Sequence, residues 1–553
     1  MNRLVRVTWL VAACWIAAAA ISTAAGEPIR VPAGGDLQAA INQARSGDRV
    51  LLAPGATYTG NFILPVHGGD SAITIATDVD DTRVPGRGRR IAPEHAPLLA
   101  KLKSPNGNPA LRTAAAARHW RLELVEVLPA AGASADLIQL GDGGSAQRDA
   151  AAVPRDLAID RCYIHGDKAA GQKRGIALNS GRTAITGSHF SDFKLSGADS
   201  QAIAGWNGTG PYLIENNYLE ASGEGFLLGG ADPWIAGLVP ADITFRRNVV
   251  SRPVAWRQEK WQVKNLFELK NARRVLVERN LFENNWSGAQ SGFAIVITPR
   301  NQDGRAPWST VEDVTFRGNI VRNAGGGVNI LGRDNERPSR VARGVRIAHS
   351  IFTGIDAKAW GGSGIFLQIG EAPEGIVVEH NTVIHSGNVI SVYGGTRERP
   401  AAVRGFVFRD NLLRHNRYGV HGQDRAPGND TLSTFFPNAV FICNALAGGH
   451  QKDYPEGNWF PSEQEFRAQF VGFDAGDYRL REESMFRGAA CDGTNVGAGV
   501  DEILEEAGKD RGPRKGQSSP RLPAHGSISR LTSCAAFPVT RPCGPRGGVG
   551  GGF

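Results

Sequence analysis

One short pattern recurs along most of the chain and constrains its fold more than any other feature. The pattern is Φ-x-Φ-x-x-N-x-Φ, where Φ is an apolar residue, and it places marker residues at Asn248, Asn280, Asn319, Asn381 and Asn411. Successive markers between positions 162 and 444 are 26 to 39 residues apart, mostly near 31. A repeat of this length indicates that the chain stacks one small structural unit on the next.

Each repeat has the composition of short strands joined by turns. The alternation Φ-x-Φ predicts a strand with one buried face, and the marker predicts a turn where asparagine tolerates left-handed backbone and its amide can bond to the next repeat. A second strand follows in most repeats, as in residues 292–297 and 364–369. No crossover helix separates the strands, which excludes barrels and doubly wound sheets of alternating strands and helices. We therefore predict an all-β fold, a right-handed parallel β-helix of roughly a dozen coils.

The beginning of the repeat region predicts a cap. Residues 36–44 form a short amphipathic pattern with Asp36 as its N-cap, followed by the Gly-Asp-Arg-Val-Leu-Leu-Ala-Pro-Gly segment at 47–55. These residues resemble the opening of the pectin-lyase-like superfamily of secreted β-helix proteins. The resemblance implies that the helix closes the first coil and that 477–501 forms the last one. The segments most similar to a group of exported bacterial β-helix proteins lie at 171–179, 201–207, 264–271 and 293–308.

Three segments differ in composition and charge. Residues 1–25 have a basic start, an apolar run and small residues at the end, which predicts a signal peptide and a secreted or periplasmic protein without a transmembrane span. Residues 26–504 would form the β-helix domain, and 505–553 a flexible basic tail rich in Gly, Pro and Ser. Of the net charge of +8, +5 lies in the tail and +2 in the signal segment. The nearly neutral body argues against nucleic acid as a partner.

The cysteines predict no metal site, because no Cys/His spacing of the usual kind occurs. Cys443 with Cys491, and Cys534 with Cys543, are possible disulfides in an oxidising compartment. Cys162 lies in an apolar pattern and is expected in the core. No cofactor is expected, although Asp78, Asp80 and Asp81 leave calcium open.

Candidate catalytic residues follow from the strand alternation. With alternate residues of the second strands buried, Lys264, Glu268 and Lys270 point outward, and Arg300 follows the next second strand. A lysine beside another cation can lose its proton and act as a base, held by Glu268, while Arg300 neutralises a substrate carboxylate. Glu224 is the alternative acid or base. The simpler interpretation is that Glu268 and Lys270 form a surface ion pair.

Candidate ligand-binding residues surround the same strands. Aromatic rings stack on sugars, and cations bind carboxylates or sulfates. In the simpler interpretation the tryptophans only cover the edge of a sheet. The expected substrate contacts are Trp206, Asn207, Asp232, Trp234, Thr298, Arg333 and Tyr393.

Two classes of function remain open. The first is a monomeric enzyme acting on an acidic polysaccharide, above all a lyase by β-elimination, with an epimerase or a glycosidase as variants. This inclination rests on the resemblance. The second is a non-catalytic module that binds carbohydrate through the same residues. A polygalacturonase-type glycosidase is rejected, because His165-Gly and His421-Gly lack that family's accompanying acidic motifs. The sequence leaves open the polymer, the bond and any metal dependence.

Overall fold

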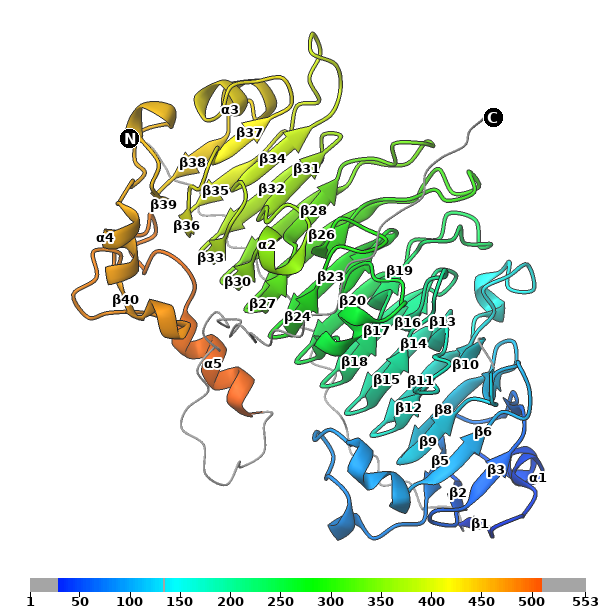
Figure 1. Ribbon diagram of the computed structural model, residues 1–553. Coiled ribbons are helices and arrows are strands. Elements are labelled where there is room, and N and C mark those ends of the chain that lie inside the picture. Colours follow the sequence, from blue (N-terminus) through cyan, green and yellow to red (C-terminus); the bar gives the residue numbers. More distant parts are fainter. Residues whose placement is uncertain (1–27, 133–134, 510–553) are drawn as a thin grey trace, which may run out of the picture.

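The computed structural model describes residues 28–132 and 135–509. The predicted signal peptide at 1–25, most of the predicted tail and the Cys534–Cys543 pair lie outside these residues. The described chain winds into a right-handed parallel β-helix with three long sheets, as predicted (Figure 1). We call the 14-stranded sheet A, the 13-stranded sheet B and the 12-stranded sheet C.

Each full coil contributes one strand to each sheet, in the order A, B, C. Sheet A contains β1 (Ile29–Val31), β2 (Arg49–Leu52), β5 (Ile73–Thr77), β8 (Arg118–Glu123), β11 (Arg155–Asp160), β14 (Gly181–Thr186), β17 (Gly210–Glu215), β20 (Ala241–Arg246), β23 (Ala272–Glu278), β26 (Val311–Arg317), β29 (Arg343–Ala348), β32 (Glu374–Glu379), β35 (Val407–Arg409) and β38 (Val440–Ile442). Sheet B contains β3 (Thr57–Thr59), β6 (Ala100–Lys103), β9 (Val125–Leu128), β12 (Tyr163–His165), β15 (His189–Phe193), β18 (Tyr218–Ala221), β21 (Val249–Ser251), β24 (Leu281–Asn285), β27 (Ile320–Ala324), β30 (Ile351–Ile355), β33 (Thr382–His385), β36 (Leu412–Arg414) and β39 (Ala445–Ala447). Sheet C contains β4 (Phe62–Leu64), β7 (Leu111–Thr113), β10 (Asp136–Leu140), β13 (Arg174–Leu178), β16 (Gln201–Gly205), β19 (Glu224–Leu228), β22 (Phe267–Leu269), β25 (Phe293–Ile297), β28 (Gly326–Leu331), β31 (Leu367–Gly370), β34 (Ile390–Tyr393) and β37 (Val420–Gly422).

The turn between sheets A and B carries the asparagine ladder that the repeat predicts. The side-chain amide of Asn248 donates to Oδ1 of Asn280 at 3.1 Å, and Asn280 donates to Asn319 at 3.0 Å. The left-handed backbone, however, falls on the residue before the marker, as at Arg247 (φ 55°) and Arg279 (φ 57°). The preceding residue makes the sharp turn, and the asparagine satisfies the buried amides of neighbouring coils.

The first coil is closed by α1 (Leu37–Gln43), as the resemblance implied. Asp36 caps this helix by accepting a hydrogen bond from the Ala39 N–H at 2.9 Å. Leu37 and Ile41 on its inner face are buried in the main hydrophobic core. The helix therefore covers side chains that would otherwise meet water at the open end.

The C-terminal part departs from the expectation of a last coil at 477–501. After α2 (Ala357–Trp360) and α3 (Asn429–Phe435), the chain forms α4 (Glu463–Ala468), β40 (Phe470–Gly472), β41 (Asp477–Leu480) and α5 (Val500–Lys509). The strands β40 and β41 are antiparallel, and this segment packs on the outside of sheet B, where Phe470, Tyr478 and Ile503 share a core with Ile320 and Ile351 (Figure 1). The expectation was wrong because the apolar face of β41 covers a sheet instead of continuing it. The helix α5 also extends five residues past the expected boundary at 504.

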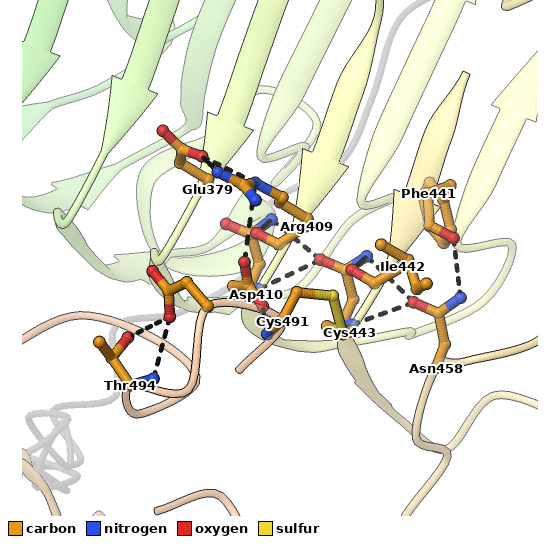
Figure 2. The surroundings of a disulfide bond; sticks show 12 residues. Glu379, Arg409, Asp410, Phe441, Ile442, Cys443, Asn458, Cys491 and Thr494 are labelled. Carbon is orange, nitrogen blue, oxygen red and sulfur yellow. Dashed lines mark hydrogen bonds and ion pairs between the residues drawn. A yellow bond between two sulfur atoms is a disulfide. The ribbon is translucent and has the colours of Figure 1, made fainter. Parts of the chain in front are cut away.

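A disulfide between Cys443 and Cys491 fastens this segment to the coils (Figure 2). The Cys491 N–H also donates to Asp410 Oδ1 at 2.7 Å. Cys162 is a free, buried thiol, as predicted. Among the described residues, no helix is long and apolar enough to span a membrane.

Candidate functional site

The outer face of sheet C carries a continuous row of polar side chains at the starts of its strands. The guanidinium of Arg174 donates to Asp136 at 2.7 Å and to Gln201 Oε1 at 3.0 Å. Gln201 in turn donates from Nε2 to Glu224 Oε2 at 2.9 Å. The parallel register places Arg174 opposite Gln201 and Gln201 opposite Glu224, so the row follows directly from the coil stacking.

Glu224 is the most strongly perturbed group on this face. Its residue is 1% exposed, and burial, followed by repulsion from Glu268, raises the pKa of its carboxyl from 4.5 to about 8. Lys264 opposes this effect, with its Nζ 3.7 Å from Glu224 Oε1. Glu224 can therefore hold or release a proton near neutral pH, as an acid–base group requires.

Glu268 lies in the adjacent strand β22 and is also 1% exposed. Its Oε1 is 2.9 Å from Lys270 Nζ, and its Oε2 accepts a hydrogen bond from the Asn265 amide at 3.2 Å. The expected ion pair of Glu268 and Lys270 is thus present, but its carboxylate is buried and not on the open surface. Repulsion between two buried carboxyl groups favours a proton on one of them.

The structure pairs both lysines that were proposed as the base with carboxylates. Lys264 bonds to Asp199, and although burial favours its neutral form, Glu224 and Asp199 together raise its pKa. Lys270 contacts Glu268 as an ammonium–carboxylate pair. The expectation assumed that the two lysines act mainly on each other, but Asp199 and Glu224 from other coils reach Lys264, and Glu268 of the same coil reaches Lys270. Each lysine side chain is 18% exposed, so both can present a cation at the surface.

Arg300 is directed away from this cluster. Its backbone N–H donates to the Lys270 carbonyl at 3.0 Å, but its guanidinium donates to Asp334 at 2.9 Å in the next coil. Thr298, at the end of the neighbouring strand, is half-buried and bonded through its N–H to the Leu269 carbonyl. Arg300 is thus occupied by a buried carboxylate of the protein, whereas Lys264 and Lys270 form ion pairs with the carboxyl pair itself.

Two of the expected sugar contacts lie too far along the axis to reach Glu268 directly. Arg333 is exposed after β28, two strands from β22. Tyr393 ends β34, four strands from β22, and covers Gly370. At about 4.8 Å per strand these separations correspond to about 10 and 19 Å. Only a ligand of several sugar units would touch both ends of this row.

The loops after β16 and β19 hold the other expected contacts. Asn207 is fully buried, and its Oδ1 accepts from the N–H of Trp234 at 2.9 Å, which gives it the role of holding the loop. Asp232 is also buried and accepts from the backbone N–H of Arg305 at 2.8 Å. Trp206 and Trp234 are half-buried. The structure therefore leaves the two tryptophans, and not Asn207 or Asp232, available to a ligand.

Both tryptophans are paired with arginines. The Trp234 ring lies 4.3 Å from the guanidinium carbon of Arg305 and 4.9 Å from that of Arg148. Arg174 lies 4.9 Å from the Trp206 ring. These stacks place planar cations and aromatic faces together at one side of the polar row.

Sequence reasoning missed Asp199, Gln201, Arg252 and Asn265. Gln201 could have been found, because Gln201-x-Ile203 and Glu224-x-Phe226 occupy the same strand position. Asp199 and Arg252 lie in loops outside the repeat, so no periodicity marks them.

The possible calcium residues are engaged by the protein. Asp80 accepts from the Thr82 N–H at 2.8 Å, and Asp78 pairs with Arg30. In the described part of the chain, the only His/Cys/Asp/Glu group close enough to hold a metal is Asp410 with Cys443 and Cys491. Because those cysteines form the disulfide, they do not provide thiolate ligands.

Known proteins resemble this chain in structure. No protein-family model matches it, and neither does any curated protein sequence. A variant of the family 6 alginate lyase AlyGC has a TM-score of 0.50 at 12% identity, covering 87% of this chain and 58% of that one. Unsubstituted AlyGC has a TM-score of 0.49 at 12% identity, and the match covers 78% of this chain but only 53% of the enzyme. A mannuronic-acid-specific family 6 lyase from human gut microbiota has a TM-score of 0.48 at 13% identity, covering 77% of this chain and 87% of that one. At these identities the likeness establishes the β-helix fold.

Proposed function

We propose that this protein is an exported, monomeric enzyme that cleaves an acidic polysaccharide by β-elimination on the outer face of sheet C. The observation that carries the proposal is the buried pair of Glu224 and Glu268, in which the pKa of Glu224 is raised to about 8. A lysine lies beside each carboxyl group, at 3.7 Å and 2.9 Å. A proton-exchanging group next to two cations is what elimination beside a carboxylate requires.

The chemistry can be written with these side chains. Lys264 and Lys270 bind the uronate carboxylate and stabilise the negative charge that develops when the neighbouring carbon loses its proton. Ionised Glu224 accepts that proton, and the electron pair forms the carbon–carbon double bond as the bond to the glycosidic oxygen breaks. Protonated Glu224 then returns the proton to the leaving oxygen. The products are an unsaturated uronate and a chain with a new end, so protons and electrons balance.

The rim of the site supports an acidic sugar polymer as substrate. The Trp206 and Trp234 rings offer faces for sugar stacking, and Arg148, Arg174 and Arg305 lie against those rings. Arg174 and Arg305 also pair with Asp136 at 2.7 Å and with Asp303 at 2.9 Å, so an acidic ligand would share them with carboxylates of the protein. The shared β-helix fold is compatible with the proposal but does not carry it.

Hydrolysis is the second candidate, and the same pair of carboxyl groups favours it. A protonated Glu224 next to an ionised Glu268 matches the division between general acid and carboxylate in glycosidases.

One experiment separates these functions. Protein lacking residues 1–25 is incubated with pectate, alginate or glycosaminoglycans, and both unsaturated products and new reducing ends are measured. Elimination yields both signals together, whereas hydrolysis yields reducing ends without ultraviolet absorbance. Glu224→Gln should lower either rate by about a hundredfold or more, the usual contribution of a positioned acid–base group. Glu220→Gln, a buried carboxyl on sheet B, is the matched control and should keep the rate. Retention on a polysaccharide gel without any product would instead identify a binding module.

A further inference from the structure

Arg252 is the largest fully buried side chain of the described residues, and its bonds converge on the carboxyl pair. It directly follows strand β21 of sheet B. Its Nε donates to the Ala221 carbonyl at 2.7 Å, and its Nη2 donates to the carbonyls of Gly223, at 2.6 Å, and Asn265. Its Nη1 donates to the side-chain oxygen of Asn285. The guanidinium is thus held by backbone carbonyls and one amide.

Two of these carbonyls belong to the supports of the site. Gly223 immediately precedes Glu224, and Asn265 is the residue whose amide donates to Glu268. The Asn265 N–H also donates to the Gly223 carbonyl at 3.2 Å. One guanidinium group therefore fixes the chain entering β19 against the chain entering β22. A fixed planar fork of donors holds such an arrangement better than a flexible ammonium group would.

We propose that Arg252 is the positioning residue of the carboxyl pair, which ties the segments bearing Glu224 and Asn265 together and places a buried positive charge beside Glu224. This proposal rests on the proposed function only for its catalytic consequence. Arg252 acts through Glu224 and Asn265, because its guanidinium nitrogens donate to acceptors of the protein itself.

We expect the charge of Arg252 to act on Glu224 together with the other groups that face this carboxyl. Gln201 in β16, Lys264 and Glu268 around β22, and Asp199 from the preceding loop are the neighbours that act on its carboxyl. Burial lowers the pKa of Arg252, and the charge of Glu224 acts in the opposite direction. Loss of the positive charge should move the titration midpoint of Glu224 upward by about one pH unit.

The test uses protein stability, so it does not require an active enzyme. The pH dependence of unfolding is measured with and without Glu224→Gln, and the difference between the two curves reports the titration of Glu224. The same pair is then measured with Arg252→Gln, which removes the charge, and with Arg252→Lys, which keeps it. Arg252→Met, of similar length but apolar, is the second neutral variant if Arg252→Gln does not fold. Arg161→Gln is the matched control, because Arg161 is also buried but bonds to Asp160 and Pro85 in another turn.

We expect the titration midpoint of Glu224 to rise in the neutral variants Arg252→Gln and Arg252→Met. It should remain unchanged in Arg252→Lys and in Arg161→Gln. An unchanged midpoint in a folded neutral variant would overturn it, as would equal shifts in the neutral and lysine variants. If only Arg252→Lys folds, a displaced midpoint in that variant would also overturn it. Where the enzyme is active, the pH–rate profile of the neutral variant should shift in the same direction. An inactive wild type with the expected stability shift would refute the proposed function and leave this inference standing.

Discussion

Replacing Glu224 by glutamine should change how the stability of the protein depends on pH. Burial and the nearby Glu268 raise the pKa of Glu224 from 4.5 to about 8 in the folded protein. Between these values the folded chain holds a proton that the unfolded chain has released. The free energy of unfolding of the wild type therefore falls as the pH rises through this window. Glutamine keeps the shape and the bond from Gln201 but has no charge to bury.

The size of the effect follows from the pKa difference. At about 1.4 kcal/mol per pKa unit, the shift corresponds to about 3–5 kcal/mol. Relative to wild type, Glu224→Gln should thus gain about 3–5 kcal/mol between pH 5 and pH 9. The variant should be relatively most stable at alkaline pH, where the wild type must bury a second charge.

The assay is urea unfolding followed by tryptophan fluorescence at several pH values. Glu220→Gln provides the comparison, because burial, followed by the charge of Asp192, raises the pKa of Glu220 to about 7 on sheet B. The gain in stability of Glu220→Gln over wild type should stop growing near pH 7, at a lower pH than the corresponding gain of Glu224→Gln. A difference between wild type and Glu224→Gln that does not vary with pH would refute the reasoning about the site.

Three further predictions concern the frame and the cations. Asn319→Leu should lower the free energy of unfolding by about 1–3 kcal/mol, because the backbone N–H and the side-chain amide of Asn280 lose their acceptor. The exposed Asn42→Leu is the control, and an unchanged melting temperature in Asn319→Leu would argue against the ladder. Lys270→Met should raise the KM for uronate polymers at least about tenfold through the lost charge-assisted bond, whereas the exposed Lys452→Met should not. Cys491→Ser should destabilise by about 4 kcal/mol, the loop-closure value for a separation of 48 residues, and equal denaturation midpoints for oxidised wild type and variant would contradict this.

The repeat alone was enough to predict the architecture. The alternation around Asn248, Asn280 and Asn319 fixes which residues face inward, and its period allows only stacked coils. The capping helix at Asp36 and the burial of Cys162 are local consequences of the same patterns, and the structure confirms both. These features depend on neighbours in sequence or on the same position one coil away, so periodicity carries the information.

The site was only partly predictable, because some of its contacts do not follow the period of the repeat. Glu268, Lys264 and Lys270 were found because they lie in or beside a strand, where alternation assigns their direction, and Glu224 because it follows a glycine at the start of a strand. Their chemical roles depend on Asp199 and Arg252, which belong to loops of different length in different coils.

Only the tertiary structure could decide which charged side chains contact each other. Asp199 reaches Lys264 across 65 residues, and together with Glu224 it raises the pKa of this lysine, which the sequence suggested as a base. Likewise, the strand β41 has the composition of a further coil, but it covers sheet B because an apolar sheet face was available there. Strand direction is set by local backbone geometry, whereas the protonation of Glu224 is set by burial and by charges that only folding brings together.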